Sequence, residues 1–520
     1  MLNLTFDNQF TSVLPGDSES GSRQRQLSQA IFARVAPKPA ARPHLMHCSR
    51  EVAEMVGLSE AQCQSDEFVQ AFSGSSMLPG MDPHATCYGG HQFGNWAGQL
   101  GDGRAINLGE VTTSNGHLML QLKGAGPTPF SRSADGLAVL RSSLREYLCS
   151  EAMHHLGIPT TRALSLIGTG EEVIRDILYD GNPAPEPGAV VCRVSSSFVR
   201  FGHFQMLAAR QETDLLKVFT DFVIQREFPQ LISKQGLGKE QYVEFFNAVC
   251  ARTAELMVHW MRVGFVHGVM NTDNLSILGE TIDYGPYGWL DNFDPEWTPN
   301  TTDAANRRYR YSQQPAIAQW NLMQLANALL PLIEDPKPLE EALTEFASNY
   351  QQRWQTMMAA KLGLPRYEDK LVNRLLALLS NYEIDMTLFF RGLGHLTSSA
   401  NNPFAQLADA YYLPEHTHGK AREDMEHWVQ DYLAEAKRQN QDDDTRQQLM
   451  QSTNPKYLLR NYLAQVAIDD AENGDYKKID TLLEVLRRPY DEQPEHDEYA
   501  QKRPEWARHR AGCSMLSCSS

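Results

Sequence analysis

The sequence predicts an α+β protein of two lobes, the first rich in strands and the second mostly helical. Residues 118–123 place leucine at alternate positions, as a half-buried strand does. Asn115-Gly116, just before them, is a strong signal for a hairpin turn. Long amphipathic helices are expected only later, from about residue 214 onward. A run of strands followed by a run of helices is typical of an α+β chain.

The strand-rich N-lobe is expected over residues 96–200, after an N-terminal extension at 1–95. Its first strand is predicted around 104–111, and its second ends at Lys123. Further β-rich runs continue to about residue 194, because apolar and β-branched residues recur there.

One helix is predicted inside this lobe, from about 137 to 156, with a leucine stripe that Gly157 and Pro159 terminate. Two polar segments are expected to lack regular structure. The first 25 residues are expected to be mobile, and residues 182–188, with three prolines, are expected to form a surface loop.

The helical C-lobe is expected over residues 201–435, with amphipathic helices at about 214–227 and 240–263. Residues 436–520 are predicted to form a C-terminal helical extension and a loose tail. A polar interruption at 439–448 is expected to be solvated. The second of the two helices leads into the segment that carries the clearest chemistry.

That segment matches the catalytic loop of kinase-like enzymes except at one position. In such enzymes the loop runs His-x-Asp, then four residues, then Asn; the Asp takes the acceptor proton, and the Asn and a second Asp in a DFG-type triplet hold magnesium. His267 and Asn274 keep this spacing, and an Asp-Tyr-Gly triplet begins at Asp283. The base position holds Val269, which cannot accept a proton. The loop therefore predicts binding of metal and ATP without the base of ordinary kinase chemistry.

The other kinase-type groups lie upstream in the expected order. Lys123 is the candidate for the phosphate-binding lysine, and Glu146 on the helix is the candidate for the ion pair that orients it. The glycine-rich string from Gly101 to Arg104 lets the backbone approach phosphates closely. The asparagine and aspartate of the loop are hard oxygen ligands, which suit Mg²⁺ or Mn²⁺.

Composition narrows the classes of partner. The chain has 520 residues, a formal net charge of −17 and a pI near 5.4. Because an acidic chain has no basic surplus to neutralise phosphates, no nucleic-acid partner is expected. No apolar run reaches the ~18 residues that crossing a membrane needs, and the N-terminus does not resemble a targeting sequence, so no membrane partner and a cytoplasmic location are expected. The oligomeric state stays open.

Several long strings give the chain a more specific resemblance. They are GGHQFG at 89–94, GDGR at 101–104, QLKGAGPTPFSR at 121–132, VLRSSLRE at 139–146, GVMNTDN at 268–274 and DYGP at 283–286. In these strings, and from about residue 25 to its end, the chain resembles the selenoprotein O family, whose members have a protein-kinase-like (pseudokinase) fold and transfer AMP rather than phosphate. Cys518 stands where selenoprotein members carry selenocysteine.

The resemblance implies an enzyme that moves AMP from ATP to Ser, Thr or Tyr hydroxyls of proteins and releases pyrophosphate; transfer of UMP from UTP stays open. In the family ATP lies reversed relative to kinases, so that its α-phosphate faces the acceptor. Asp273 then takes the role of base, and Arg193 and Arg200 bind the outer phosphates. The ATP contacts of the family also match Gly101, Gly103, Arg104, Lys123, Asp135, Gly136 and Asp283, and its metal ligands match Asn274 and Asp283.

The chain departs from the family pattern in two places. Leu137 stands where an arginine is expected, and residues 300–310 diverge. Two other classes of function also stay open. An atypical protein or small-molecule kinase could use Asp273 as a displaced base, and Val269 also suits a non-catalytic ATP-binding pseudokinase scaffold.

The tail carries two cysteines, Cys513 and Cys518, after the basic run at 508–510. The segment is expected to be exposed, and nearby positive charge lowers a thiol pKa. In a reducing compartment such a pair indicates a transient redox contact rather than a structural disulfide. Two inert cysteines on a loose end are an equal alternative.

Overall fold

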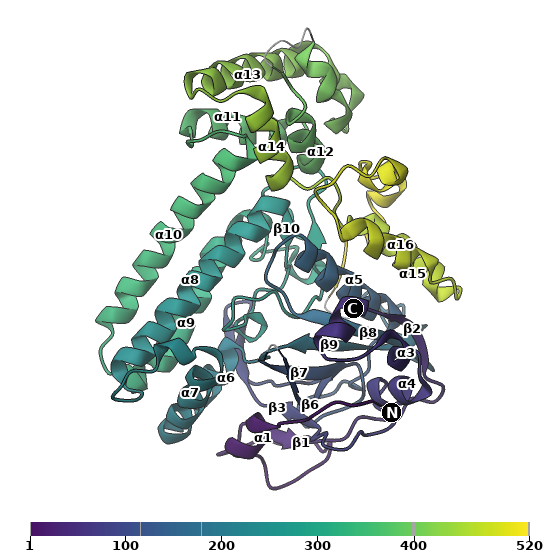
Figure 1. Cartoon of the computed structure of the whole chain (residues 1–520), viewed down its shortest axis with the longest axis vertical. Helices are drawn as coiled ribbons and strands as arrows, with labels where there is room; N and C mark the ends of the chain where they lie inside the picture. The colour runs from purple at the N-terminus through teal and green to yellow at the C-terminus, as the bar shows by residue number, and fades with distance from the viewer. Residues whose placement is uncertain (1, 115, 178, 398–401, 518–520) are drawn as a thin grey trace.

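The chain has a mixed α+β fold with one large antiparallel sheet and many helices (Figure 1). This computed structural model describes residues 2–114, 116–177, 179–397 and 402–517. The sheet lies in the lower part of Figure 1, and helices form the left side, the top and the right side of the molecule. The α+β class expected from the sequence is confirmed.

Among the described residues, seven strands form the large sheet, and each pairs antiparallel with its neighbours in the order β1-β3-β6-β7-β9-β8-β2. Their bounds are β1 Phe32–Arg34, β2 His44–Cys48, β3 His84–Thr86, β6 Ala105–Thr113, β7 Gly116–Lys123, β8 Arg162–Arg175 and β9 Ala184–Ser195. Two separate hairpins are formed by β4 Gly89–Gln92 with β5 Asn95–Gln99, and by β10 Phe265–Val266 with β11 Gly288–Trp289.

The first helices lie close to the sheet. They are α1 Gln9–Val13, α2 Arg50–Met55, α3 Glu60–Cys63, α4 Asp66–Phe72, α5 Leu140–His155, α6 Phe201–Ala209 and α7 Thr213–Glu227. The later helices are α8 Lys239–Val263, α9 Gln314–Ile333, α10 Lys337–Lys361, α11 Asp369–Asn381, α12 Met386–Leu393, α13 Gly419–Arg438, α14 Asp443–Thr453, α15 Asn461–Glu472 and α16 Lys477–Leu486. Helices α7 and α8 match the predicted 214–227 and 240–263 to within one residue. Helix α8 ends at Gly264, whose positive φ of 75° terminates it.

Both faces of the sheet are covered by helices. Alternate side chains of a strand point to opposite faces and so enter two different cores. On β9, Val191 belongs to the core formed with α5, whereas Val190 belongs to the core formed with α2, α3 and α4. On β7, Leu122 joins the second of these cores. The same alternation turns Lys123 to the opposite face, toward α5.

The core beside α5 extends away from the sheet, and the later helices bury one more apolar region. Helix α5 lies between the sheet and the pair α15 and α16, and its core continues into α8 and α9. A separate core holds α11, α12, α13 and α14 together with the end of α10 (top of Figure 1). Helix α5 is therefore enclosed by segments from both ends of the chain.

The first 25 residues, expected to be mobile, are packed against the sheet. Helix α1 forms there, and Phe10 and Leu14 are buried. The backbone N–H of Phe10 donates a hydrogen bond to the carboxylate of Glu110 on β6. The sequence did not reveal this packing because the segment is mostly polar, and the two apolar side chains that anchor it form no pattern.

Two other segments also have more regular structure than expected. Strand β9 begins at Ala184, so most of the predicted loop at 182–188 pairs with β8. Prolines are tolerated there because residues 184–187 pair with β8 and not with β7, as in an edge strand. Within 439–448, the side chain of Asp442 accepts a hydrogen bond from the N–H of Thr445 and caps α14.

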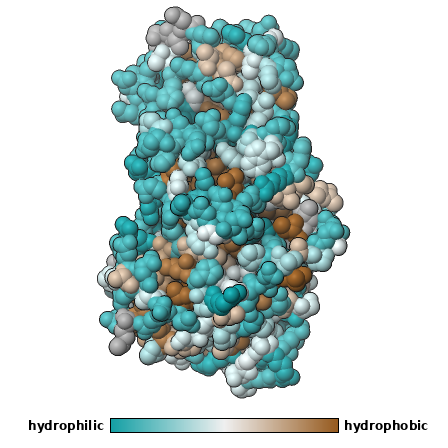
Figure 2. Space-filling view, turned by 90° about the vertical axis from the view of Figure 1, so that its right-hand side faces the viewer, coloured by the Kyte–Doolittle hydropathy of each residue, from teal (hydrophilic) through white to brown (hydrophobic). Residues whose placement is uncertain are grey.

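The face of the molecule in Figure 2 is mostly hydrophilic, with hydrophobic residues in separate small groups. In the part of the chain that the structure describes, no helix combines the length and apolar character that crossing a bilayer requires. Small exposed groups of apolar side chains, like those in Figure 2, are normal for a folded chain and do not indicate a partner.

Candidate functional site

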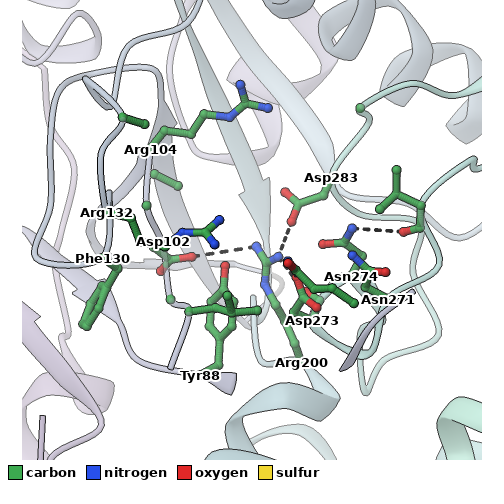
Figure 3. A pocket seen from close by; sticks show the side chains of 18 of the residues that line it. Tyr88, Asp102, Arg104, Phe130, Arg132, Arg200, Asn271, Asp273, Asn274 and Asp283 are labelled. Carbon is green, nitrogen blue, oxygen red and sulfur yellow. Dashed lines mark hydrogen bonds and ion pairs between the residues drawn. The ribbon is translucent and has the colours of Figure 1, made fainter. Parts of the chain in front are cut away.

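A cavity of about 610 Å³ lies where the end of β7, the β5–β6 loop and the loop after β10 meet (Figure 3). We call it the catalytic cavity. Of the residues predicted from the sequence, it brings together Gly101, Gly103, Arg104, Lys123, Arg193, Arg200, Asp273, Asn274 and Asp283. These residues come from segments almost 200 positions apart, so the fold gathers them into one site.

Lys123 and Glu146 form the expected ion pair at one wall of the catalytic cavity. The Nζ atom of Lys123 lies 2.5 Å from a carboxylate oxygen of Glu146 and 3.8 Å from one of Asp283. Both Lys123 and Glu146 are buried. Burial lowers the pKa of Lys123 to about 8, although the two carboxylates oppose this shift. Lys123 is thus a fixed cation that is neutralised above mildly alkaline pH.

Asp283 is held by two arginines. Its carboxylate accepts hydrogen bonds from Arg193, on β9, and from Arg200, at the start of α6 (Figure 3). Burial alone would raise the pKa of Asp283, but the charges of Arg200, Arg193 and Lys123 hold it well below its usual range. Asp283 also adopts a left-handed backbone conformation, with φ of 56°. Such a conformation is uncommon outside glycine and is found at functional turns.

Asp273 has the opposite environment. It lies in a 3-10 turn, Thr272–Asn274, and burial raises its pKa to about 6. Its Oδ2 accepts a hydrogen bond from Gln92 at 3.4 Å, and its buried Oδ1 has no partner among the described residues. A Cβ atom at Gly90 would lie 2.3 Å from this Oδ1, so only glycine fits there. A carboxylate with one free oxygen and a raised pKa is suited to accept a proton.

His267 and Asn274 fix the loop that carries Asp273. The Nε2 atom of His267 contacts the carbonyl oxygen of Ile282 at 2.9 Å and so ties the loop to the segment of Asp283. The amide nitrogen of Asn274 donates to the carbonyl oxygen of Val269 at 3.0 Å, which leaves the amide oxygen available to a cation. The oxygens of Asn274 and Asp283 make a donor set that fits a hard divalent cation.

Glu51, His154 and His155 form another group that could ligate a metal, with ligand atoms within 4.8 Å of one another. Glu51 already accepts from Arg487 at 3.1 Å and lies 3.4 Å from Arg162. Because these cations compete for the carboxylate, the group is less suited to a metal than the oxygens of the catalytic cavity.

Two of the predicted ATP contacts, Asp135 and Gly136, do not line the catalytic cavity. Asp135 pairs with Arg175 at 2.8 Å. Gly136, with φ of 71°, packs against the backbone of Gly126 and closes the loop before α5. Their expected contact with ATP stays a prediction.

Sequence reasoning missed several groups around the catalytic cavity. Asp102 accepts two hydrogen bonds from Thr86 and lies 3.8 Å from Arg200. Asp102 lies inside the Gly-Asp-Gly-Arg string at 101–104, and its place in this motif could have marked it as a site residue. Tyr309 donates to Asn271 at 2.6 Å, but it lies in the divergent segment 300–310, and no motif marks it.

The tail is packed rather than exposed. Cys513 is buried, and burial raises the pKa of its thiol to about 11. Arg145 of α5 donates to the carbonyl oxygen of Gly512, and Leu516 pairs with Asn300. The expected activated thiol is therefore wrong for Cys513, because burial outweighs the nearby charge. Cys518 lies outside the described residues.

The chain is similar to known proteins over most or all of its length. The family model described as "Protein adenylyltransferase SelO" matches residues 18–487. The protein nucleotidyltransferase YdiU of Azoarcus sp. (strain BH72) is 56% identical over 524 residues, 100% of each chain. The protein of the same name from Rhodopirellula baltica is 53% identical over 537 residues, 100% of this chain and 99% of the relative. That from Xanthomonas axonopodis pv. citri is 55% identical over 524 residues, again 100% of each.

Proposed function

This chain belongs to the protein adenylyltransferase SelO family and is a protein nucleotidyltransferase, and we propose that it transfers AMP from ATP to Ser, Thr or Tyr hydroxyls of other proteins with release of pyrophosphate. ATP is the co-substrate, and Mg²⁺ or Mn²⁺ is the cofactor. UTP is an alternative donor to be tested beside ATP. The site of action is the cytoplasm, and the partners are acceptor proteins.

The fold that supports this chemistry is of the bilobal protein-kinase type. The N-lobe comprises residues 96–200 and the C-lobe residues 201–435, with extensions at 1–95 and 436–520. In support, Lys123 ends a strand of the sheet, Glu146 pairs with it from a helix, and the loop with Asp273 follows a long helix. This is the order of parts in a kinase.

The cations of the catalytic cavity bind the triphosphate. Lys123 and Arg193 offer buried positive charge at the N-lobe side, and Arg200 offers a planar guanidinium beside the loop. In this structure Asp283 pairs with Arg193 and Arg200, so a metal bound to its carboxylate would share it with the two arginines. A divalent cation bound by Asn274 and Asp283 would neutralise phosphate oxygens and polarise the phosphorus.

Asp273 moves the proton. The acceptor hydroxyl forms a new bond from its oxygen to the α-phosphorus, while the bond between this phosphorus and the bridging oxygen of the β-phosphate breaks. Pyrophosphate leaves with that electron pair, and the hydroxyl proton passes to the free Oδ1 of Asp273. With a pKa of about 6, Asp273 is mostly ionised at neutral pH and can accept the proton. Arg193 and Arg200 stabilise the charge that grows on the leaving group.

The observation that carries the proposal is the position of Asp273. It lines the same cavity as Lys123 and Asp283, whereas Val269 at the usual base position offers no proton acceptor. The base has therefore moved along the loop while the lysine and the metal ligands have kept their kinase places. Such a change suits a reaction at a different phosphorus.

Paired labelling tests the proposal. The protein and a mixture of acceptor proteins are incubated with metal and either α-³²P-ATP or γ-³²P-ATP. AMP transfer leaves the α label on protein, and labelling from the γ position would show a kinase instead. Asp273→Asn should lose the α label, whereas Asp409→Asn, which changes an exposed acid elsewhere, should keep it. ATP binding without transfer of either label would contradict the proposal.

A further inference from the structure

A second cavity, of about 340 Å³, adjoins the catalytic cavity. We call it the outer cavity. Phe93 lines both cavities, and Asp303, Arg308 and Arg310 are among the other residues of the outer cavity. A hydrogen bond holds the two walls together: the backbone N–H of Phe93 donates to the hydroxyl of Tyr309 at 2.9 Å, and Tyr309 follows Arg308 in the chain.

The turn that presents Phe93 is an unusual one. Phe93 and Gly94 form the two-residue connection between β4 and β5, and their φ angles are 50° and 85°. Two positive φ values are the mark of a type I′ turn, which favours Asn, Asp or Gly. A phenylalanine in the first place is strained, because its Cβ disfavours the left-handed backbone conformation. Strain of this kind persists where the side chain has a use, and here the ring packs on Tyr309 at 5.3 Å.

Arg308 is a positioned cation that forms no salt bridge among the described residues, although its charge acts on Asp303. Its guanidinium lies 4.8 Å from the ring centre of Trp320, and a Cβ at Gly94 would lie 3.3 Å from its Cζ. Its guanidinium also lies 5.8 Å from the ring centre of Tyr309 and acts on the hydroxyl of that residue, and its buried Nε has no hydrogen-bond partner among the described residues. Arg310, by contrast, lies 2.9 Å from Glu296.

The acid that borders the outer cavity is already used by the loop itself. The two carboxylate oxygens of Asp303 accept hydrogen bonds from the backbone N–H groups of Arg308 and Tyr309, at 3.0 and 2.7 Å. This carboxylate shapes the loop and balances part of its charge. The guanidinium of Arg308 is left to face an incoming acid.

The surroundings have the composition of a protein-binding surface. Trp96 on β5 is 40% exposed, and His91 lies between Trp96 and Trp320, with ring centres 5.1 and 5.4 Å away. Tryptophan and arginine are enriched among the residues that dominate protein interfaces. The same hairpin reaches the catalytic base, since Gln92 donates to Asp273.

We propose that the outer cavity binds an acidic side chain of the acceptor protein, with Arg308 as its partner and Phe93 guiding the acceptor chain from one cavity to the other. This inference rests on the proposed function and adds a sequence preference to it: Asp or Glu within a few residues of the modified hydroxyl. An extended chain advances about 3.3–3.6 Å per residue, so neighbouring cavities are reached within that span.

Synthetic peptides test the inference. One series carries a single acceptor hydroxyl and one glutamate moved along the chain, and a matched series carries glutamine instead. Transfer from α-³²P-ATP is measured for the wild type, Arg308→Gln, Arg308→Glu and the matched control Arg374→Gln, which changes an exposed arginine on α11. Phe93→Asn removes the ring while keeping a residue that the turn favours. Metal-dependent ATP binding shows that each variant is folded.

The wild type should prefer one glutamate position, and Arg308→Gln should lower that preference, as a ratio of kcat/KM values, about tenfold. Arg308→Glu should favour a lysine at the same position, and Phe93→Asn should raise KM more than it lowers kcat. Arg374→Gln should keep the wild-type ratio. Transfer by the wild type without any acidic preference, or an Arg308→Gln variant with the wild-type ratio, would overturn the docking inference alone. Absence of the α label from every peptide and protein would overturn the proposed function, and this inference with it.

Discussion

Two buried clusters of arginines and carboxylates differ in what surrounds them. The site cluster (Lys123, Glu146, Arg193, Arg200 and Asp283) lines or supports the catalytic cavity. The structural cluster (Asp291, Asp385, Arg460 and Arg503) lies between the loop after β11, α12 and the C-terminal segments.

The two key aspartates have different partners. Asp385 accepts hydrogen bonds from Arg460 at 2.8 and 3.0 Å and from Tyr412 at 2.9 Å. It also accepts one from the N–H of Leu388 and so caps α12. Its side chain is fully buried, whereas 20% of the Asp283 side chain is exposed to the catalytic cavity. A buried ion pair therefore does not by itself mark a functional site. The distinguishing property is an opening through which a ligand can replace one partner.

Replacing Asp385 or Asp283 by alanine should give the largest effects on stability and on transfer. The two variants should also show which cluster stabilises the fold and which supports the reaction. Asp385→Ala leaves Arg460 buried without its partner and should lower the free energy of unfolding by about 3–5 kcal/mol. Asp283→Ala should lower transfer at least about a hundredfold, because it removes both a proposed metal ligand and the anchor of two arginines. Denaturant unfolding and the α-label assay measure the two quantities. Equal loss of stability in both variants would show that the site cluster is structural as well.

The pH dependence of transfer should come from two groups of the catalytic cavity, Asp273 and Lys123. Because the base must be ionised and burial raises the pKa of Asp273 to about 6, kcat/KM should fall about tenfold per pH unit below 6. It should also fall above about 8, where Lys123 loses its proton. A profile at saturating metal measures this. A rate that stays constant from pH 5 to 7 would remove Asp273 from the role of base.

The structural cluster should titrate without changing the rate. Burial raises the pKa of Asp291 to about 6, so this group favours the folded state when protonated. Its contribution is complete below its ordinary pKa of about 4 and is lost as the pH rises through about 6. Asp291→Asn should flatten this part of the stability profile and leave the pH–rate profile of transfer in place. A shift of the rate profile would instead couple the two clusters.

A smaller effect is expected in the tail. Cys513→Ala should lower the free energy of unfolding by about 1 kcal/mol, because it removes one buried side chain, and it should leave transfer unchanged. With its thiol pKa raised to about 11, Cys513 should react slowly with alkylating reagents at neutral pH. Thermal unfolding and mass spectrometry after alkylation check both statements. Rapid labelling of Cys513 in the folded protein would restore the exposed tail that the sequence suggested.

The smallest change is expected from Val269→Asp. Restoring a carboxylate at the kinase base position should produce no transfer of the γ-phosphate, since the proposed reaction takes place at the α-phosphorus. Labelling with γ-³²P-ATP measures this, with Val269→Asn as the matched polar control. Appearance of the γ label in the aspartate variant would favour the ordinary orientation of ATP.

Regular patterns in the sequence predicted much of the fold. Alternating leucines placed Lys123, and the apolar stripes of α7 and α8 gave their bounds to within one residue. Segments that depend on contacts with distant residues could not be read in this way. The N-terminal segment is fixed by Glu110, about a hundred positions later, and the tail by α5 and the segment around Asn300.

The candidate site shows the same division. Groups inside motifs, such as Lys123, Glu146 and Asp283, were found because their spacing carries chemistry. Their arrangement was not foreseen, since nothing in the spacing shows that Asp283 contacts both arginines. Arg308 was missed because its importance comes from the absence of a salt bridge among the described residues, which only the folded chain reveals.

The enclosure of α5 bears on how the protein is made. This helix carries Glu146, and its outer side is covered by α15 and α16, which come more than 300 residues later. Tyr147 contacts His47, which in turn pairs with Asp480 of α16 at 2.9 Å. A ribosome builds the chain from its N-terminus. The helix that holds Lys123 through Glu146 therefore gains its full support only near the end of synthesis, and a chain truncated before α15 lacks that support.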